Sequence, residues 1–243
     1  MKKNNALKLT SLYTNFSFQK ITIIILSISL ISMVLFMFII SNPWISNEEY
    51  LLNYEGFHDN YFRLSLLIIE IFNGIIIASF VITLIINANS FDFLFISNNK
   101  RMYLSISKII TLLLIFMALT LFEFIILNVV ALLKYSLYKI NINSILILLF
   151  IFLSMLFEAG LSMLLTTLVN SIFIPMILLF VGIIIRLLSS SFPKIEEIIS
   201  KIFPIINING NDIIFNSYLV TPILTILFFV IYVFYYNIKD LKE

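Results

Sequence analysis

The chain has 243 residues, of which 61% are hydrophobic and 12% are charged, and its formal net charge is +2. A soluble domain averages about 45–50% apolar and about 25% charged residues, so this composition excludes a soluble globular protein and predicts an integral membrane protein. The near balance of charges argues against nucleic-acid binding, and a sequence without cysteine has neither disulfides nor thiolate metal sites.

Six continuous apolar runs are each close to the roughly 20 residues that a helix needs to cross a bilayer. A β-barrel would instead show alternating segments of about ten residues. We therefore predict an all-α integral membrane protein that forms a single domain over residues 1–243. The predicted spans cover residues 21–40, 64–86, 109–133, 144–169, 172–188 and 218–236.

The segment before the first span is basic and has one apolar stripe. Leu9, Leu12, Tyr13 and Phe16 recur at the spacing i, i+3, i+4, i+7, which places them on one face of a helix. A basic helix with such a stripe can lie in the membrane interface, and the alternative is a frayed basic tail. No small-x-small cleavage site follows the first apolar run, so we expect that run to remain as a span.

Two longer polar segments separate the spans on one side. Asn42-Pro43 is expected to end the first span, because proline cannot continue the helical hydrogen-bond ladder, and residues 46–63 are then expected to form a loop with a turn at Gly56. The second segment covers residues 189–217 and contains a short amphipathic helix in our prediction. Its apolar face consists of isoleucines at helical spacing: Ile195, Ile198, Ile199 and Ile202.

The distribution of basic residues predicts the orientation. Nine of the 15 Lys and Arg residues fall on the side of both termini and of residues 90–108, whereas five fall on the other side. Basic residues favour the cytoplasmic side. We therefore expect both termini and residues 90–108 to be cytoplasmic, in a bacterial plasma membrane, and the loops at 46–63 and 189–217 to face outward.

Four charged residues fall inside the predicted spans: Glu70, Glu123, Glu158 and Arg186. A charge at the bilayer centre costs about 2.5–3.5 kcal/mol or more, so these side chains should face the bundle, a partner subunit or water. One interpretation is a structural ion pair of Arg186 with Glu70 or Glu123. The other is a conformational latch or a site for a cationic substrate.

Residues 90–108, SFDFLFISNNKRMYLSISK, join the second and third predicted spans and are too apolar for a solvated loop. Asp92, Leu94, Phe95, Arg101 and Lys108 follow one another here in an order that resembles the membrane subunits of ABC-2 type transporters. That family has six spans and a short cytoplasmic coupling helix between spans two and three. The chain departs from the family at residues 98–100, where Asn-Asn-Lys replaces a usual proline.

The resemblance extends over the whole chain. The family has an elbow helix before the first span, similar to residues 9–16, and extracellular amphipathic segments between spans five and six, similar to residues 195–202. It often ends in an aromatic residue followed by a basic residue and Asp, similar to residues 236–240. The chain itself contains no G-x-x-x-x-G-K-[ST] phosphate-binding motif.

The resemblance implies a transport subunit that is not an enzyme and holds no cofactor. ATP and Mg would be bound by two copies of a separate ATP-binding subunit, and the membrane subunit would pair with a second one, expected to be an identical chain. The ATP-binding subunit would dock on the coupling helix at residues 90–101. The expected docking face is Phe91, Asp92, Phe93, Leu94 and Phe95, with Arg101 and Lys108 as its charged edge.

The expected cargo is an amphipathic or hydrophobic peptide, because the chain is small, lacks large outer domains and has aromatic-rich spans. Within the family it looks like permeases for phenol-soluble modulin-like toxins or antimicrobial peptides. Permeases for lantibiotic immunity, and exporters of lipids or small hydrophobic compounds, are the alternatives. An ATP-independent channel or secondary transporter would show repeats or broken helices. An intramembrane enzyme would need a catalytic constellation within the spans.

Overall fold

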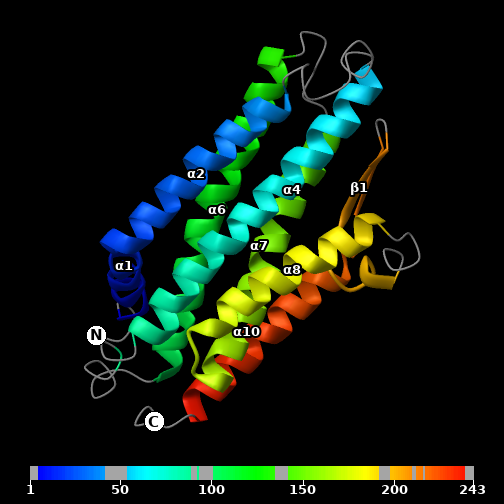
Figure 1. The fold of residues 1–243 in the computed structure, drawn as a ribbon. Coiled ribbons are helices and arrows are strands. Elements are labelled where there is room, and N and C mark those ends of the chain that lie inside the picture. Colours follow the sequence, from blue (N-terminus) through cyan, green and yellow to red (C-terminus); the bar gives the residue numbers. More distant parts are fainter. Residues whose placement is uncertain are drawn as a thin grey trace.

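The fold is taken from a computed structural model that describes residues 5–41, 54–88, 92, 101–134, 142–191, 198–209, 212–215 and 217–238. Within these ranges, the side chains of residues 5–7, 54–60, 142–144, 186–191, 207–209 and 212–214 lie outside the description. The helices form one elongated bundle with a small hairpin among them (Figure 1). In chain order the elements are α1 (Asn5–Ser17), α2 (Lys20–Ile40), α4 (Tyr54–Val81), the π-helix η1 (Ile82–Asn87), α6 (Arg101–Lys134), α7 (Ile142–Val169), α8 (Phe173–Ser191), β1 (Ile206–Asn209), β2 (Asp212–Phe215) and α10 (Val220–Ile238).

Among the described residues, five helices are long and apolar enough to cross a membrane, namely α2, α4 with η1, α6, α7 and α10. The described residues are thus mainly helical and compatible with an all-α, multi-pass membrane protein. The fifth predicted span, residues 172–188, corresponds to α8, whose described apolar part, Phe173–Ile185, is shorter than a full span. A tight turn joins α7 to α8, and its Asn170 has a φ of 54°.

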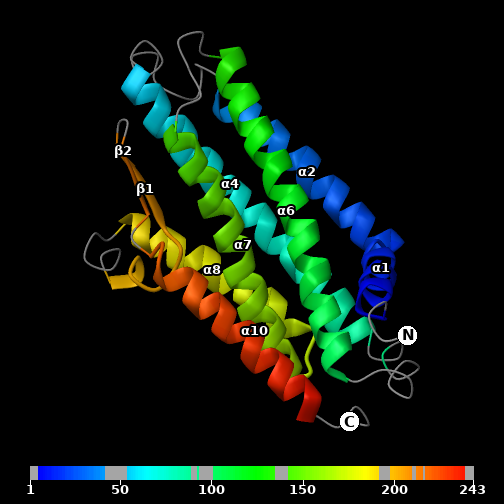
Figure 2. The ribbon, with the colours of Figure 1, turned by 180° about the vertical axis from the view of Figure 1, so that it is seen from behind.

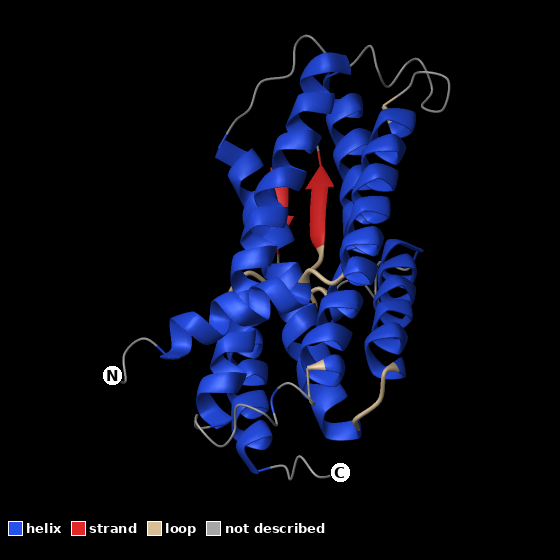
Figure 3. Ribbon diagram, turned by 90° about the vertical axis from the view of Figure 1, so that its left-hand side faces the viewer, coloured by secondary structure: helices blue, strands red, loops and turns tan. Residues whose placement is uncertain are grey.

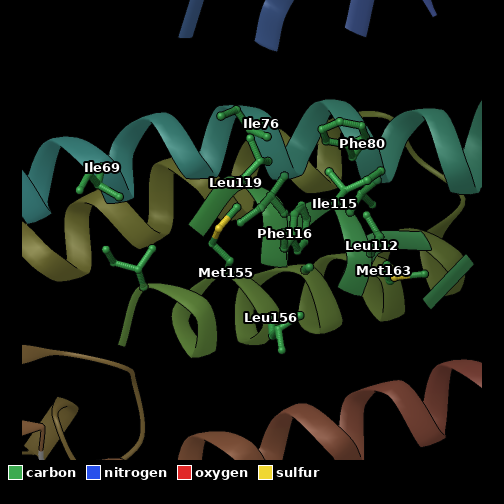
Figure 4. Close-up of a cluster of buried hydrophobic side chains, with 14 of the residues drawn as sticks. Ile69, Ile76, Phe80, Leu112, Ile115, Phe116, Leu119, Met155, Leu156 and Met163 are labelled. Carbon is green, nitrogen blue, oxygen red and sulfur yellow. The ribbon is translucent and has the colours of Figure 1, made fainter. Parts of the chain in front are cut away.

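The centre of the bundle is α4, which contacts α2, α6, α7 and α8. About 61% of its most apolar window is buried, against 17% for α2 and 22% for α10, so the latter two present most of their surface to the surroundings. Phe80 of α4 and Phe116 of α6 meet edge to face, with ring centroids 6.4 Å apart. Figure 4 shows buried apolar side chains from α4, α6 and α7 filling the space between these helices.

Two helices begin earlier than the hydropathy pattern predicts. The expected loop at 46–63 is wrong from Tyr54 onward, because α4 begins there and runs through Gly56. Glycine is tolerated at that position since the amides of a first helical turn have no intrahelical partner. Likewise α6 begins at Arg101, so residues 101–108, expected to join the second and third spans, are the first two turns of this helix.

A two-stranded antiparallel hairpin follows α8, and sequence analysis missed it. Ile206 pairs with Phe215 and Asn209 with Asp212. The Phe215 ring packs edge to face on Phe150 of α7, with centroids 5.3 Å apart, and Figure 3 shows the strands lying among the helices. The sequence carried a signal for it, since Gly210-Asn211, between the paired residues Asn209 and Asp212, is a dipeptide typical of two-residue hairpin loops.

The predicted amphipathic helix before this hairpin is shorter than expected. Residues 198–199 are helical, but a turn follows at 200–202, so a helix extending through Ile202 is wrong. Ile198 and Ile202 are exposed, Ile199 is half-buried, and Ile195 lies outside the described residues. Pro204 accounts for the early end, since it has no amide hydrogen and disfavours the α-conformation of the residue before it.

Candidate functional site

A buried polar cluster at one end of the bundle joins four segments that are far apart in the sequence. Asp92 is fully buried and accepts hydrogen bonds from Tyr13 of α1, Lys108 of α6 and Tyr236 of α10. Lys108 and Asp92 also form a salt bridge with both side chains fully buried. We refer to these four residues as the Asp92 cluster.

Local structure positions each member of the Asp92 cluster. The Asp92 amide donates to the Ala88 carbonyl at 2.7 Å, which holds Asp92 one turn beyond the π-helix η1. Lys108 lies two turns after the start of α6, and Tyr236 lies in the last turn of α10. Figures 1 and 2 show that α1, the start of α6 and the end of α10 occupy the same end of the bundle.

The cluster satisfies its buried charges by pairing and hydrogen bonding. Asp92 Oδ1 accepts from Tyr13, whereas Oδ2 accepts from both Lys108 and Tyr236. The Lys108 Nζ also lies over the two tyrosine rings, 5.5 Å from the Tyr13 centroid and 4.9 Å from the Tyr236 centroid, which adds cation–π attraction. Burial, and next the Asp92 carboxylate, raise the pKa of Tyr13, so its hydroxyl remains a donor.

This arrangement is suited to transmitting movement between helices rather than to catalysing a reaction. A buried ion pair contributes little net stability when complete, but separating its partners is expensive because each charge is then left alone in the interior. Displacement of Asp92 relative to α1, α6 or α10 is therefore resisted. A movement of the backbone at Asp92 would be passed on to these three helices.

The structure corrects part of the expected docking site. Asp92 and Lys108 are fully buried and bonded to each other, so they do not form an accessible face or charged edge. Arg101 is half-buried, and its Nη1 lies 3.5 Å from the Asn237 carbonyl of α10. The remaining members of the predicted docking face, Phe91, Phe93, Leu94 and Phe95, lie outside the described residues.

The predicted apolar stripe of α1 divides between two environments. Leu9 and Tyr13 are buried where α1 packs on α6, whereas Leu12 is 40% exposed and Phe16 is half-buried. Sequence analysis gave Tyr13 only an apolar role. Its hydroxyl function depends on Asp92, which is 79 residues away in the sequence, and helical periodicity carries no signal for such a contact.

The three charged side chains described within the spans, Glu70, Glu123 and Glu158, lie on α4, α6 and α7. Glu123 is fully buried and accepts a hydrogen bond from Asn73 of α4 at 3.0 Å, a partner that sequence analysis missed although an amide within an apolar run is a usable signal. Glu70 and Glu158 are half-buried. The side chain of Arg186 lies outside the described residues, so its ion pair with Glu70 or Glu123 stays a prediction.

Comparisons with protein-family models, with curated proteins and with solved structures found no match for this chain. Within the described part of the chain, no group of three or more His, Cys, Asp or Glu side chains is placed to hold a metal ion.

Proposed function

We propose that the chain is the membrane-spanning subunit of an ATP-driven exporter of the ABC-2 type. In this proposal α8 is the fifth of six spans, both termini are cytoplasmic and the membrane is the bacterial plasma membrane. Two ATP-binding subunits, which carry ATP and Mg, act on a pair of identical membrane subunits. The cargo is an amphipathic or hydrophobic peptide.

The observation that supports this proposal best is the Asp92 cluster. Asp92 belongs to the predicted coupling segment, and its three hydrogen-bond donors come from α1, α6 and α10. A push on residues 93–100 by an ATP-binding subunit would therefore move Asp92 and, through it, the ends of three helices. A loop with only solvated charges would yield locally and transmit little force.

The test is reconstitution with the partner subunit. The tagged chain is purified from its native membrane, a co-purifying protein that carries a phosphate-binding loop is identified, and both are reconstituted in proteoliposomes. We expect the ATPase rate of the partner to change at least about threefold on addition of the chain. If the ATPase rate of the partner does not change when the chain is added, the proposal is contradicted.

Substitutions in the predicted docking face sharpen this test. Phe93→Asp and Leu94→Asp place a charge where an apolar contact is expected, and we expect both to abolish the change in ATPase rate and the export of peptide. Leu52→Asp, in the predicted outer loop, is the matched control and should keep both activities. Normal export by either docking variant would refute the docking face.

A further inference from the structure

A cavity of about 100 Å³ lies between α4, α7 and α8, and its described lining includes no residue of the Asp92 cluster. An engineered apolar cavity of roughly 150 Å³ accommodates benzene, so this one takes a group about the size of one apolar side chain. Its walls are mostly aliphatic and aromatic. They include Ile77 of α4, Phe157 of α7, Leu178 and Leu179 of α8, and the segment Phe203–Ile205 that precedes the hairpin.

Two polar side chains of α7 line this otherwise apolar space. Ser162 is 3% exposed, and its Oγ has no hydrogen-bond partner within the described part of the chain. Glu158 lies one helical turn before Ser162 and is the one charged side chain among the described lining residues. A buried hydroxyl without a hydrogen-bond partner is destabilising, so a ligand that bonds to it recovers free energy on binding.

The chemistry of the lining distinguishes between kinds of ligand. The tail of a lipid would fill the apolar volume but would leave the Ser162 hydroxyl without a partner. A peptide helix supplies an apolar side chain for the cavity, and the backbone amides of its first turn, which have no intrahelical partner, can donate to Ser162 Oγ. A carboxylate at the same wall favours peptides with basic side chains over acidic ones.

We propose that this cavity is a peptide-binding subsite, in which one apolar side chain of an amphipathic basic peptide fills the space and an adjoining amide donates to Ser162. This inference rests on the proposed function and names the part of the chain that contacts cargo. It places a contact within one membrane subunit, between α4, α7 and α8.

The experiment measures binding of a synthetic peptide to the purified full chain in phosphatidylcholine nanodiscs. The probe is an acetylated, dansyl-labelled amphipathic helix of leucine and lysine, titrated without any ATP-binding subunit. Ser162→Ala removes the acceptor and should raise the dissociation constant about 3- to 10-fold. Ser162→Leu, which also fills the cavity, should raise it at least as much.

Thr166→Val is the matched control. Thr166 lies one turn further along α7, is fully buried, and its Oγ1 likewise has no hydrogen-bond partner within the described residues, but it does not line the cavity. Its variant should bind the peptide with an unchanged dissociation constant. The inference is overturned if Ser162→Ala binds the peptide as tightly as the unaltered chain does. It is also overturned if Ser162→Ala and Thr166→Val lose the same amount of peptide affinity.

The outcomes separate the subsite from the proposed function. Binding is measured without ATP, so the two proposals can fail separately. If the chain regulates an ATPase partner but its peptide affinity does not depend on Ser162, the exporter proposal stands and the subsite is refuted. The same peptide with glutamate in place of lysine should bind more weakly. If both peptides bind with one affinity, the assignment of basic peptides as ligands is wrong.

Discussion

Replacement of Lys108 by Met tests whether the Asp92 cluster holds this end of the bundle together. Met has a similar length but no charge, so the Asp92 carboxylate would keep only the hydroxyls of Tyr13 and Tyr236 as donors. Breaking a buried ion pair by removing one partner costs about 3–5 kcal/mol. Because folded proteins are stable by only about 5–15 kcal/mol, this is a large fraction of the total.

The measurement is reversible unfolding of the purified chain in mixed micelles, followed by circular dichroism. We expect Lys108→Met and Asp92→Asn each to lower the free energy of unfolding by about 3–5 kcal/mol, and the double variant to lose less than either single one, since it leaves no unpaired charge. Arg101→Met, two turns earlier on α6 and half-buried, is the control and should cost under about 1 kcal/mol.

The reasoning would be refuted in either of two ways. A loss below about 1 kcal/mol in Lys108→Met would mean that the Asp92 carboxylate reaches water or another cation. A double variant as unstable as the sum of the single losses would mean that the two side chains act independently.

Three further predictions follow from single contacts. Tyr236→Phe removes one hydrogen bond to a charged group, and the free energy of unfolding should fall by about 1.5–3 kcal/mol in the same assay. Burial and Asp92 raise the pKa of Tyr13 above its ordinary value of 10.0, so with rising pH the Tyr13 hydroxyl loses its proton in the unfolded chain before it does so in the folded one. The free energy of unfolding contributed by this group should therefore be constant below about pH 10 and fall above it, and the fall should be less steep in Tyr13→Phe. Asn170 is left-handed, with φ of 54°, so Asn170→Val should lower the melting temperature, whereas Asn170→Gly should leave it nearly unchanged.

The membrane helices could be predicted well because one physical variable, the length of an apolar run, determines them. The ends of the helices could not be predicted in this way. Both α4 and α6 begin in polar residues before their apolar runs, and a hydropathy profile does not distinguish such residues from a loop. The hairpin was missed for a different reason. Its Gly210-Asn211 dipeptide was visible, but the short isoleucine-rich stretches on either side could not be assigned to strand or helix by periodicity alone.

The Asp92 cluster shows where prediction from sequence stops. Asp92 and Lys108 were singled out by their order along the chain and expected on an accessible surface, whereas the structure buries both. Their meeting with Tyr13 and Tyr236 spans up to 144 residues and depends on how α1 and α10 pack. No periodicity within one helix contains that information, whereas a buried Asp and Lys near each other in sequence do signal that partners must exist.

The two sites are connected through two helices that are each continuous. Helix α4 carries Ile77 at the cavity wall and continues through η1 to the turn that holds Asp92. Helix α10 ends in the Asp92 cluster and packs along α7, where a Cβ at Gly160 would lie 3.4 Å from Phe228 Cβ, so that the two backbones are close. A displacement of Asp92 would thus reach the two cavity walls formed by α4 and α7. It would reach the first along α4 itself and the second through α10, which packs on α7. Closely packed helices transmit such a shift, because their interior cannot be compressed appreciably. Substitutions in the cluster should therefore alter peptide affinity at Ser162, even though the two sites share no residue.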